Sequence, residues 1–207
     1  PRLTRLQLEL GGKDPSYVCD DAPVAAAAAS LADGAFYNTG QSCCSVERIY
    51  VSERIFAQFV DAFVAEVRRF RRGDPADEST YIGPLTRAPQ LKVLEAQVKD
   101  AVKKGARVLV GGKRIKSKGN WFEPTVLVDV DPSMRVVCEE VFGPVVTVQR
   151  FTELEPVMAR ISAEQSGTEA GLAHLEELAR AQPQAAPDLY AARAALLEWR
   201  GDDRRAG

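Results

Sequence analysis

Within the first forty residues, a stretch in which apolar and polar positions alternate is followed by a stretch with the composition of a helix. Residues 6–10 alternate leucine with polar side chains, which is the spacing of a half-buried strand, and Gly11-Gly12 would end that strand. The alanine-rich stretch Ala22–Asn38 predicts a helix. Asp20-Asp21 offers an N-cap for this helix and Gly40 a C-cap. The pattern therefore predicts strand, tight loop and helix in that order.

Beyond Gly40, short runs of valine and isoleucine predict strands, and longer stretches with apolar residues three or four apart predict amphipathic helices. The predicted strands are Arg48–Ser52, Val108–Val110, Phe122–Val130 and Val145–Val148, and the predicted helices are Glu53–Arg72 and Ala88–Lys104. Strands that alternate with helices of this length are typical of an α/β domain with a mostly parallel sheet flanked by helices.

The composition changes abruptly near residue 152. Neither valine nor isoleucine occurs after Ile161, and alanine supplies 13 of the last 57 residues. Apolar residues at helical spacing, around residues 172–179 and 190–199, predict two helices separated by Pro183 and Pro187. We therefore divide the chain into an α/β unit, 1–151, and a divergent helical tail rich in Ala, Arg and Glu, 152–207. The tail is either a small appendage or the product of a junction, fusion or frame change.

Composition excludes several classes of function. The net charge of −2 over 207 residues argues against a nucleic-acid or anionic-membrane surface, and no apolar run approaches the ~18 residues of a membrane span. Four cysteines and one histidine provide neither a disulfide framework nor a metal-ligand set. Free thiols favour a reducing cytoplasm. A proline at position 1 leads us to expect that the native start lies upstream.

Three short motifs carry the candidate chemistry. They are Leu8–Lys13 (LELGGK), Phe36–Cys44 (FYNTGQSCC) and Glu139–Pro144 (EEVFGP). In this order, and over roughly Leu6–Phe151, they resemble the active-site and cofactor signatures of the aldehyde dehydrogenase family. Any one of them alone would be a weaker indication than the three together.

The resemblance implies that Cys43 is the nucleophile and Glu9 the general base. A thiolate adds readily to an aldehyde, forming a thiohemiacetal that becomes a hydrolysable thioester once hydride has left. Hydrolysis then needs a carboxylate to activate water. Cys43 follows a helix, where the dipole disfavours a thiolate, so its ionisation needs a base, a cation or the oxidised cofactor.

The cofactor implied by the resemblance is NAD or NADP. The backbone at Leu10 and Gly11 would line the nicotinamide site, Glu140 would hydrogen-bond the nicotinamide ribose and Phe142 would pack near that ring. The implied substrate is a small-molecule aldehyde, and full-length members of the family form homo-oligomers. Family members are more than twice as long as this chain, so we expect the isolated chain to be inactive. The alternative is a non-enzymatic remnant that acts as a binding or assembly module.

The remaining candidate residues have less specific interpretations. We expect Cys19 and Cys138 to be structural and protected, and the side chain of Cys44 to point away from the site. Lys13 is either a functional cation or a surface charge. His174 lies in the tail and is expected to be a solvated helix residue.

Overall fold

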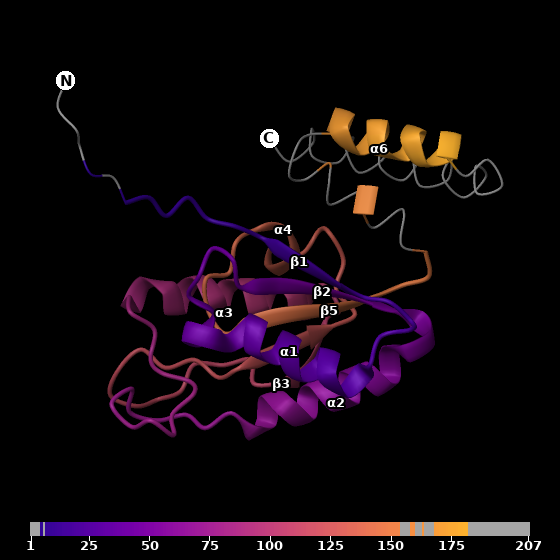
Figure 1. Ribbon diagram of the computed structural model, residues 1–207. Helices are drawn as coiled ribbons and strands as arrows, with labels where there is room; N and C mark the ends of the chain where they lie inside the picture. Colours follow the sequence, from indigo (N-terminus) through magenta and orange to yellow (C-terminus); the bar gives the residue numbers. More distant parts are fainter. Residues whose placement is uncertain (1–4, 6, 154–157, 160–162, 164–167, 182–207) are drawn as a thin grey trace. The chain divides into compact units, whose positions relative to one another are not determined.

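The computed structural model describes residues 5, 7–153, 158, 159, 163 and 168–181 (Figure 1). The chain forms two compact units, residues 1–150 and 151–207. In the second unit, α6 (Thr168–Ala181) is a helix, as the leucine spacing predicted, and it contains His174. The helix predicted over 190–199 lies outside the described residues.

The first unit is built on a five-stranded sheet. From one edge to the other its strands are β1 (Asp14–Val18), β2 (Val46–Ser52), β5 (Val145–Phe151), β4 (Thr125–Val128) and β3 (Arg107–Val110). β1 runs parallel to β2 and β4 runs parallel to β5, whereas the edge strand β3 runs antiparallel to β4. The α/β class is confirmed, with a sheet that is mixed.

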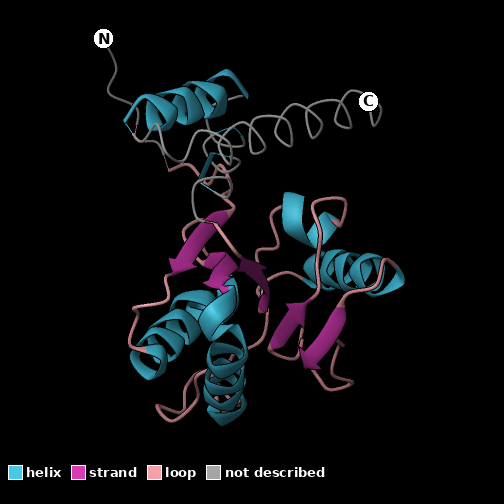
Figure 2. Cartoon of the chain, turned by 90° about the vertical axis from the view of Figure 1, so that its right-hand side faces the viewer, coloured by secondary structure: helices cyan, strands magenta, loops and turns pink. Residues whose placement is uncertain are grey.

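Helices cover both faces of this sheet (Figure 2). They are α1 (Val24–Phe36), α2 (Phe56–Arg69), α3 (Ala88–Lys103) and the short α4 (Arg135–Cys138), with 3-10 turns η1 (Tyr37–Gly40) and η2 (Glu53–Ile55). Val126 and Val128 of β4 pack into one core with α1 and α2, and Leu127 packs into a second core with α3 and α4. Alternate residues of a strand point to opposite faces, so the two cores lie on either side of the sheet.

The amphipathic helices form where the apolar spacing predicted them. In α2, Phe59, Phe63 and Val67 recur every four residues and are buried, and the rings of Phe59 and Phe63 stack at 5.6 Å between centroids. Burial of each such phenylalanine stabilises the fold by roughly 1.5–3 kcal/mol. This stripe anchors α2 to the first core.

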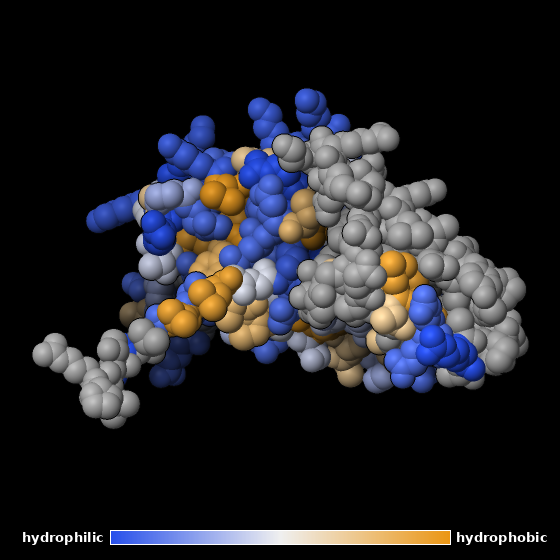
Figure 3. Space-filling model, turned by 90° about the horizontal axis from the view of Figure 1, so that it is seen from above, coloured by the Kyte–Doolittle hydropathy of each residue, from blue (hydrophilic) through white to orange (hydrophobic). Residues whose placement is uncertain are grey.

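The strand predicted over residues 6–10 is wrong. Residues 7–13 have no strand pairing, and the first strand is β1, four residues further on. Leu8 and Leu10 are 68% and 84% exposed, and the space-filling view shows apolar surface on this extended segment (Figure 3). Extended backbone with alternating leucines has the same period as a strand, so periodicity alone could not separate the two. The sequence pattern did not predict β1 because it contains Pro15, and proline argues against a strand. An edge strand such as β1 nevertheless tolerates proline.

Two capping predictions are also wrong in detail. The N-cap of α1 is Pro23, with no side-chain cap, and Asp20-Asp21 lies in the preceding turn. α1 ends at Phe36, and Gly40 is the last residue of η1, where its φ of +68° places it in the left-handed region. A Cβ at Gly40 would also overlap the carbonyl oxygen of Gly143. Gly40 thus permits a close approach between two loops as well as ending a turn.

Packing of α3 against the sheet gives a first prediction. Leu94 is fully buried, so Leu94→Ala should lower the free energy of unfolding by about 2–5 kcal/mol through the cavity it leaves. Val102, on the same helix, is 47% exposed, and Val102→Ala should change it by less than about 0.5 kcal/mol. Urea unfolding followed by circular dichroism measures both. Equal midpoints for the two variants would contradict this packing.

Candidate active site

The three motifs lie just before three neighbouring strands. The segment Glu9–Lys13 precedes β1, Cys43 and Cys44 precede β2, and Glu139–Pro144 precedes β5. Because β1 and β2 are parallel, the segments that lead into them meet at the same end of the sheet, where both strands begin. A Cβ at Gly12 would overlap the carbonyl oxygen of Cys43, so the two backbones touch. Only glycine fits at position 12.

Glu9 and Cys43 come together at this end of the sheet. Cys43 is half-buried and Glu9 is exposed, with its Oε1 accepting a hydrogen bond of 3.1 Å from the amide of Gly11. The pKa of Cys43 is raised, first by a hydrogen bond with Cys44, then by burial and by the negative charges of Cys44 and Glu9. The Glu9 carboxylate thus disfavours ionisation of the Cys43 thiol.

The thiol of Cys44 does not point away from Cys43, contrary to our expectation. The two sulfur atoms lie 3.9 Å apart, and Cys44 Sγ lies 3.6 Å from Ser42 Oγ, which accepts a 2.6 Å hydrogen bond from Tyr37. Hydrogen bonding from Ser42, then from Cys43 and Tyr37, lowers the pKa of Cys44. A thiolate accepts hydrogen bonds well, and this gives the pair one more acidic and one less acidic member.

The other two cysteines differ in accessibility. Cys19 is half-buried, whereas Cys138 is exposed, so the expectation that Cys138 is protected is wrong. Cys138 is the last residue of α4, a helix of four residues that cannot enclose a side chain on every side. All four cysteines are free. Exposure alone therefore does not distinguish Cys43 from the other cysteines, because Cys19 is also half-buried.

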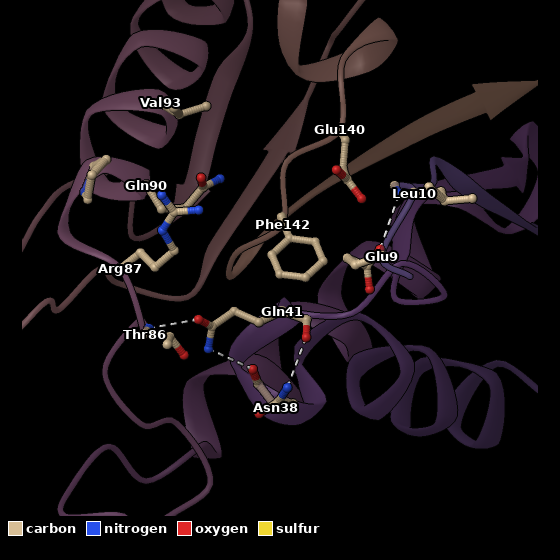
Figure 4. Close-up of a pocket in the computed structure, with 12 residues that line it drawn as sticks. Glu9, Leu10, Asn38, Gln41, Thr86, Arg87, Gln90, Val93, Glu140 and Phe142 are labelled. Atoms are coloured by element: carbon tan, nitrogen blue, oxygen red, sulfur yellow. Dashed lines mark hydrogen bonds between the residues drawn. The ribbon is translucent and has the colours of Figure 1, made fainter. Parts of the chain in front are cut away.

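A cavity of about 850 Å³ opens beside these segments (Figure 4). Its lining includes Glu9 and the four residues assigned to cofactor binding, which are Leu10, Gly11, Glu140 and Phe142. In the close-up the ring of Phe142 lies between Glu140 and Glu9 on one side and Gln41 and Arg87 on the other. The start of α3 and the loop before it also contribute Thr86, Arg87 and Gln90, which sequence reasoning did not identify because no motif marks them.

Glu140 reaches the backbone of the first motif. Its Oε1 accepts a hydrogen bond of 2.9 Å from the amide of Gly12, and a Cβ at Gly11 would lie 3.1 Å from its Oε2. Burial raises the pKa of Glu140, opposed by the Gly12 amide and reinforced by the charges of Glu47 and Glu9. Glu140 is thus held between protein backbone and the cavity.

A residue that sequence reasoning missed, Glu47, joins the same segments. Its carboxylate is 3% exposed and pairs with Lys13 Nζ at 2.6 Å. It also accepts hydrogen bonds from the amides of Val141 and Phe142, at 2.9 and 3.0 Å. Burial lowers the pKa of Lys13 and the charge of Glu47 raises it. Lys13 is therefore not a surface charge. The sequence signal that could have revealed this pair was Glu47 itself, a charged residue within the β-rich run Val46–Ser52.

Neither a metal cluster nor a membrane-crossing helix occurs in the part of the chain that the structure describes. Within residues 5, 7–153, 158, 159, 163 and 168–181, no three His, Cys, Asp or Glu side chains are placed to hold a metal ion. Over the same residues, no helix combines the length and apolarity that crossing a membrane would require.

Comparison with known proteins gives a consistent result. The model of the family described as "Aldehyde dehydrogenase family" matches residues 1–184, which extends past Phe151 into the tail. A probable succinate-semialdehyde dehydrogenase (NADP+) of Sinorhizobium fredii is 43% identical over 157 residues, covering 76% of this chain and 32% of that protein. The chain thus spans about one third of the length of such relatives.

Solved structures agree in fold. The crystal structure of lactaldehyde dehydrogenase from Escherichia coli matches with a TM-score of 0.70 and 40% identity, covering 73% of this chain and 32% of that one. The structure of 3,6-anhydro-L-galactose dehydrogenase in complex with NAP matches with a TM-score of 0.71 and 40% identity, covering 75% and 33%.

The coupled thiols give a second prediction. Cys44 and Glu9 both raise the pKa of Cys43, so removing either should lower it and let the thiolate form at lower pH. The pH profile for alkylation of Cys43, followed by peptide mass spectrometry, should shift to lower pH in Cys44→Ala and in Glu9→Gln. Cys138→Ala should leave it unchanged. A shift to higher pH in either variant would contradict the arrangement.

Proposed function

The chain belongs to the aldehyde dehydrogenase family, and on that premise we propose that it supplies the nucleophile and base of an NAD(P)-dependent aldehyde oxidation. The observations that support the proposal are the backbone contact between Gly12 and Cys43 and a neighbouring cavity lined by Glu9, Glu140 and Phe142. The product is a carboxylic acid, and the reaction passes through a thiohemiacetal and a thioester on Cys43.

The cavity has the side chains that a nicotinamide nucleotide needs. The carboxylate of Glu140 can accept hydrogen bonds from ribose hydroxyls, while Leu10 and the ring of Phe142 offer apolar faces to a planar ring. Glycines at 11 and 12 let the backbone approach closely. When bound, NAD or NADP accepts the hydride that leaves the substrate carbon.

Cys43 begins the reaction by adding its sulfur to the aldehyde carbon. Its raised pKa keeps the free thiol protonated near neutral pH, so the proton must pass to a base as the bond forms. Glu9 is the carboxylate beside it. Close contact between the Gly12 and Cys43 backbones brings the segment that carries Glu9 next to the segment that carries Cys43.

Glu9 then serves the hydrolytic half of the reaction. Glu9 is exposed, so the proton that it accepts from Cys43 passes to solvent before hydrolysis begins. The ionised carboxylate then takes a proton from water as the water attacks the thioester carbon, and the carbon–sulfur bond breaks to release the acid and restore Cys43. The exposure of Glu9 to the cavity gives water access to its carboxylate. Its hydrogen bond to Gly11 holds one oxygen toward the backbone and leaves the other free for this task.

A chimera tests these roles. Residues 7–153 would replace the matching segment of lactaldehyde dehydrogenase from Escherichia coli, which is 40% identical over 158 residues. The chimera should oxidise an aldehyde, and Cys43→Ser should lower kcat by ~10⁴-fold or more. Glu9→Gln should release one equivalent of NADH per site and then slow by ~10²–10⁴-fold in steady-state turnover, because thioester hydrolysis lacks its base. Cys138→Ala, which removes a thiol that does not line the cavity, is the control and should keep the kcat of the chimera. Normal turnover in Cys43→Ser would refute the assignment.

The isolated chain should bind the cofactor weakly and show no turnover. The contacts that we assign to the cofactor, those of Glu140 and Phe142, would hold only the nicotinamide ribose end of a dinucleotide. We expect NMR titration with NAD to give a Kd of about 1 mM or weaker, which corresponds to ~4 kcal/mol of binding free energy. Micromolar affinity would show that the binding energy resides elsewhere.

A further inference from the structure

Glu47 stands at the meeting point of three segments that the proposed reaction uses. It lies on β2, four residues after Cys43, and its carboxylate binds Lys13 Nζ at 2.6 Å. The same carboxylate accepts hydrogen bonds from the amides of Val141 and Phe142. One buried side chain therefore ties the strand that follows the nucleophile to the base segment and to the cofactor segment.

Both oxygens of this carboxylate are occupied. Oε2 faces Lys13 and the Val141 amide, and Oε1 accepts from Val141 and Phe142. Removing an ionised group from water is costly, and an apolar pair of similar volume often stabilises a fold equally well. A buried charge with this many directed partners is better explained by the geometry that it enforces than by the stability that it adds.

The backbone conformation of Phe142 is unfavourable unless hydrogen bonds from neighbouring residues stabilise it. Phe142 has a φ of +48°, a left-handed conformation that costs energy for any residue with a Cβ. Glu47 holds its amide, while Gln90 Nε2 donates to the carbonyl of Val141 at 2.6 Å and Gln97 Nε2 donates to the carbonyl of Glu140 at 3.0 Å. The segment is thus held from its amide side and from its carbonyl side.

We propose that Glu47 is a positioning residue that keeps Glu140 and Phe142 in place to bind the nicotinamide ribose of the cofactor. The inference rests on the proposed function for its ligand, while its structural basis is the pairing with Lys13, Val141 and Phe142. Glu47 is not itself among the residues that line the cavity, and it acts through the backbone of Val141 and Phe142.

The Glu47 carboxylate accepts hydrogen bonds from Lys13 on one side and from the amides of Val141 and Phe142 on the other, so replacing it with Gln tests its role. An amide has one oxygen, so in Glu47→Gln the NH₂ must face either the ammonium of Lys13 or the amides of Val141 and Phe142. Donor then opposes donor on one side. Adding Lys13→Met removes the ammonium, so that the Gln oxygen can turn to the two backbone amides and its NH₂ toward the carbonyl of Val136, which Lys13 Nζ contacts at 2.8 Å.

Amide hydrogen exchange of the 207-residue chain, resolved by NMR, measures the effect. In Glu47→Gln, exchange at Val141 and Phe142 should accelerate by about 10- to 100-fold, because hydrogen bonds to a buried carboxylate are lost. The double variant with Lys13→Met should return to within about threefold of the parent. Glu66→Gln, which breaks the exposed pair with Arg69, is the matched control and should change neither amide.

The outcomes separate positioning from general stabilisation. Unchanged exchange in Glu47→Gln, or an equal rise at Val146 and Val148 of β5, would overturn the proposal. So would a double variant that exchanges faster than the single one, since that is the result of merely adding two defects to a core.

A second arm brings in the ligand. NAD at ~10 mM, above the weak affinity expected for the isolated chain, should slow exchange at Phe142 in the parent and in the double variant but not in Glu47→Gln. Equal protection in Glu47→Gln would refute the positioning role. Absence of protection in the parent would instead refute the nicotinamide site, and hence the proposed function, while exchange in the free chain still decides whether Glu47 holds the segment.

Discussion

A carboxylate in the interior must have its charge balanced, and in this chain that requirement organises the candidate site. Glu47 obtains its partners from segments that come from distant parts of the sequence, with Lys13 34 residues before it and Val141 94 residues after it. Desolvation of the pair opposes folding, so the arrangement persists because each hydrogen bond is short and directed. The backbone that carries Glu140 and Phe142 is determined by this balance as much as by hydrophobic packing.

Strand direction supplies the second half of the arrangement. Because β1 and β2 are parallel, the segments that lead into them share one end of the sheet, and glycine at position 12 leaves no side chain to hold these segments apart. The acidity of the thiols follows from this proximity. Glu9 and Cys44 both disfavour ionisation of Cys43, while Ser42 and Tyr37 favour ionisation of Cys44. These opposite effects make Cys43 the less acidic and Cys44 the more acidic of the two neighbouring thiols.

Much of the fold could be predicted because its signals are local. The stripe of Phe59, Phe63 and Val67 needs only its own spacing to indicate a helix, and short valine-rich runs sufficed for β4 and β5. The motifs likewise singled out Glu9, Glu140 and Phe142, which line one cavity, and Cys43, whose backbone contacts Gly12; the roles assigned to them stay predictions. The predictions that failed concerned features that depend on contacts with residues distant in the sequence. Residues 6–10 alternate like a strand, but the described residues among them have no strand to pair with, and β1 is recognisable only beside β2. Nor does any local window show that Glu47 is buried or that Cys44 turns toward Cys43.

The position of Pro15 has a consequence for association between molecules. β1 is the outermost strand on its side of the sheet, and such a strand can recruit a strand from another chain through its free backbone groups. Proline has no N–H to offer, so the ladder on that side is interrupted within its first two residues. At the opposite edge β3 begins with the exposed, charged Arg107, which opposes stacking of like strands. Both outer strands of the five-stranded sheet therefore carry a residue that disfavours the addition of a strand from another molecule.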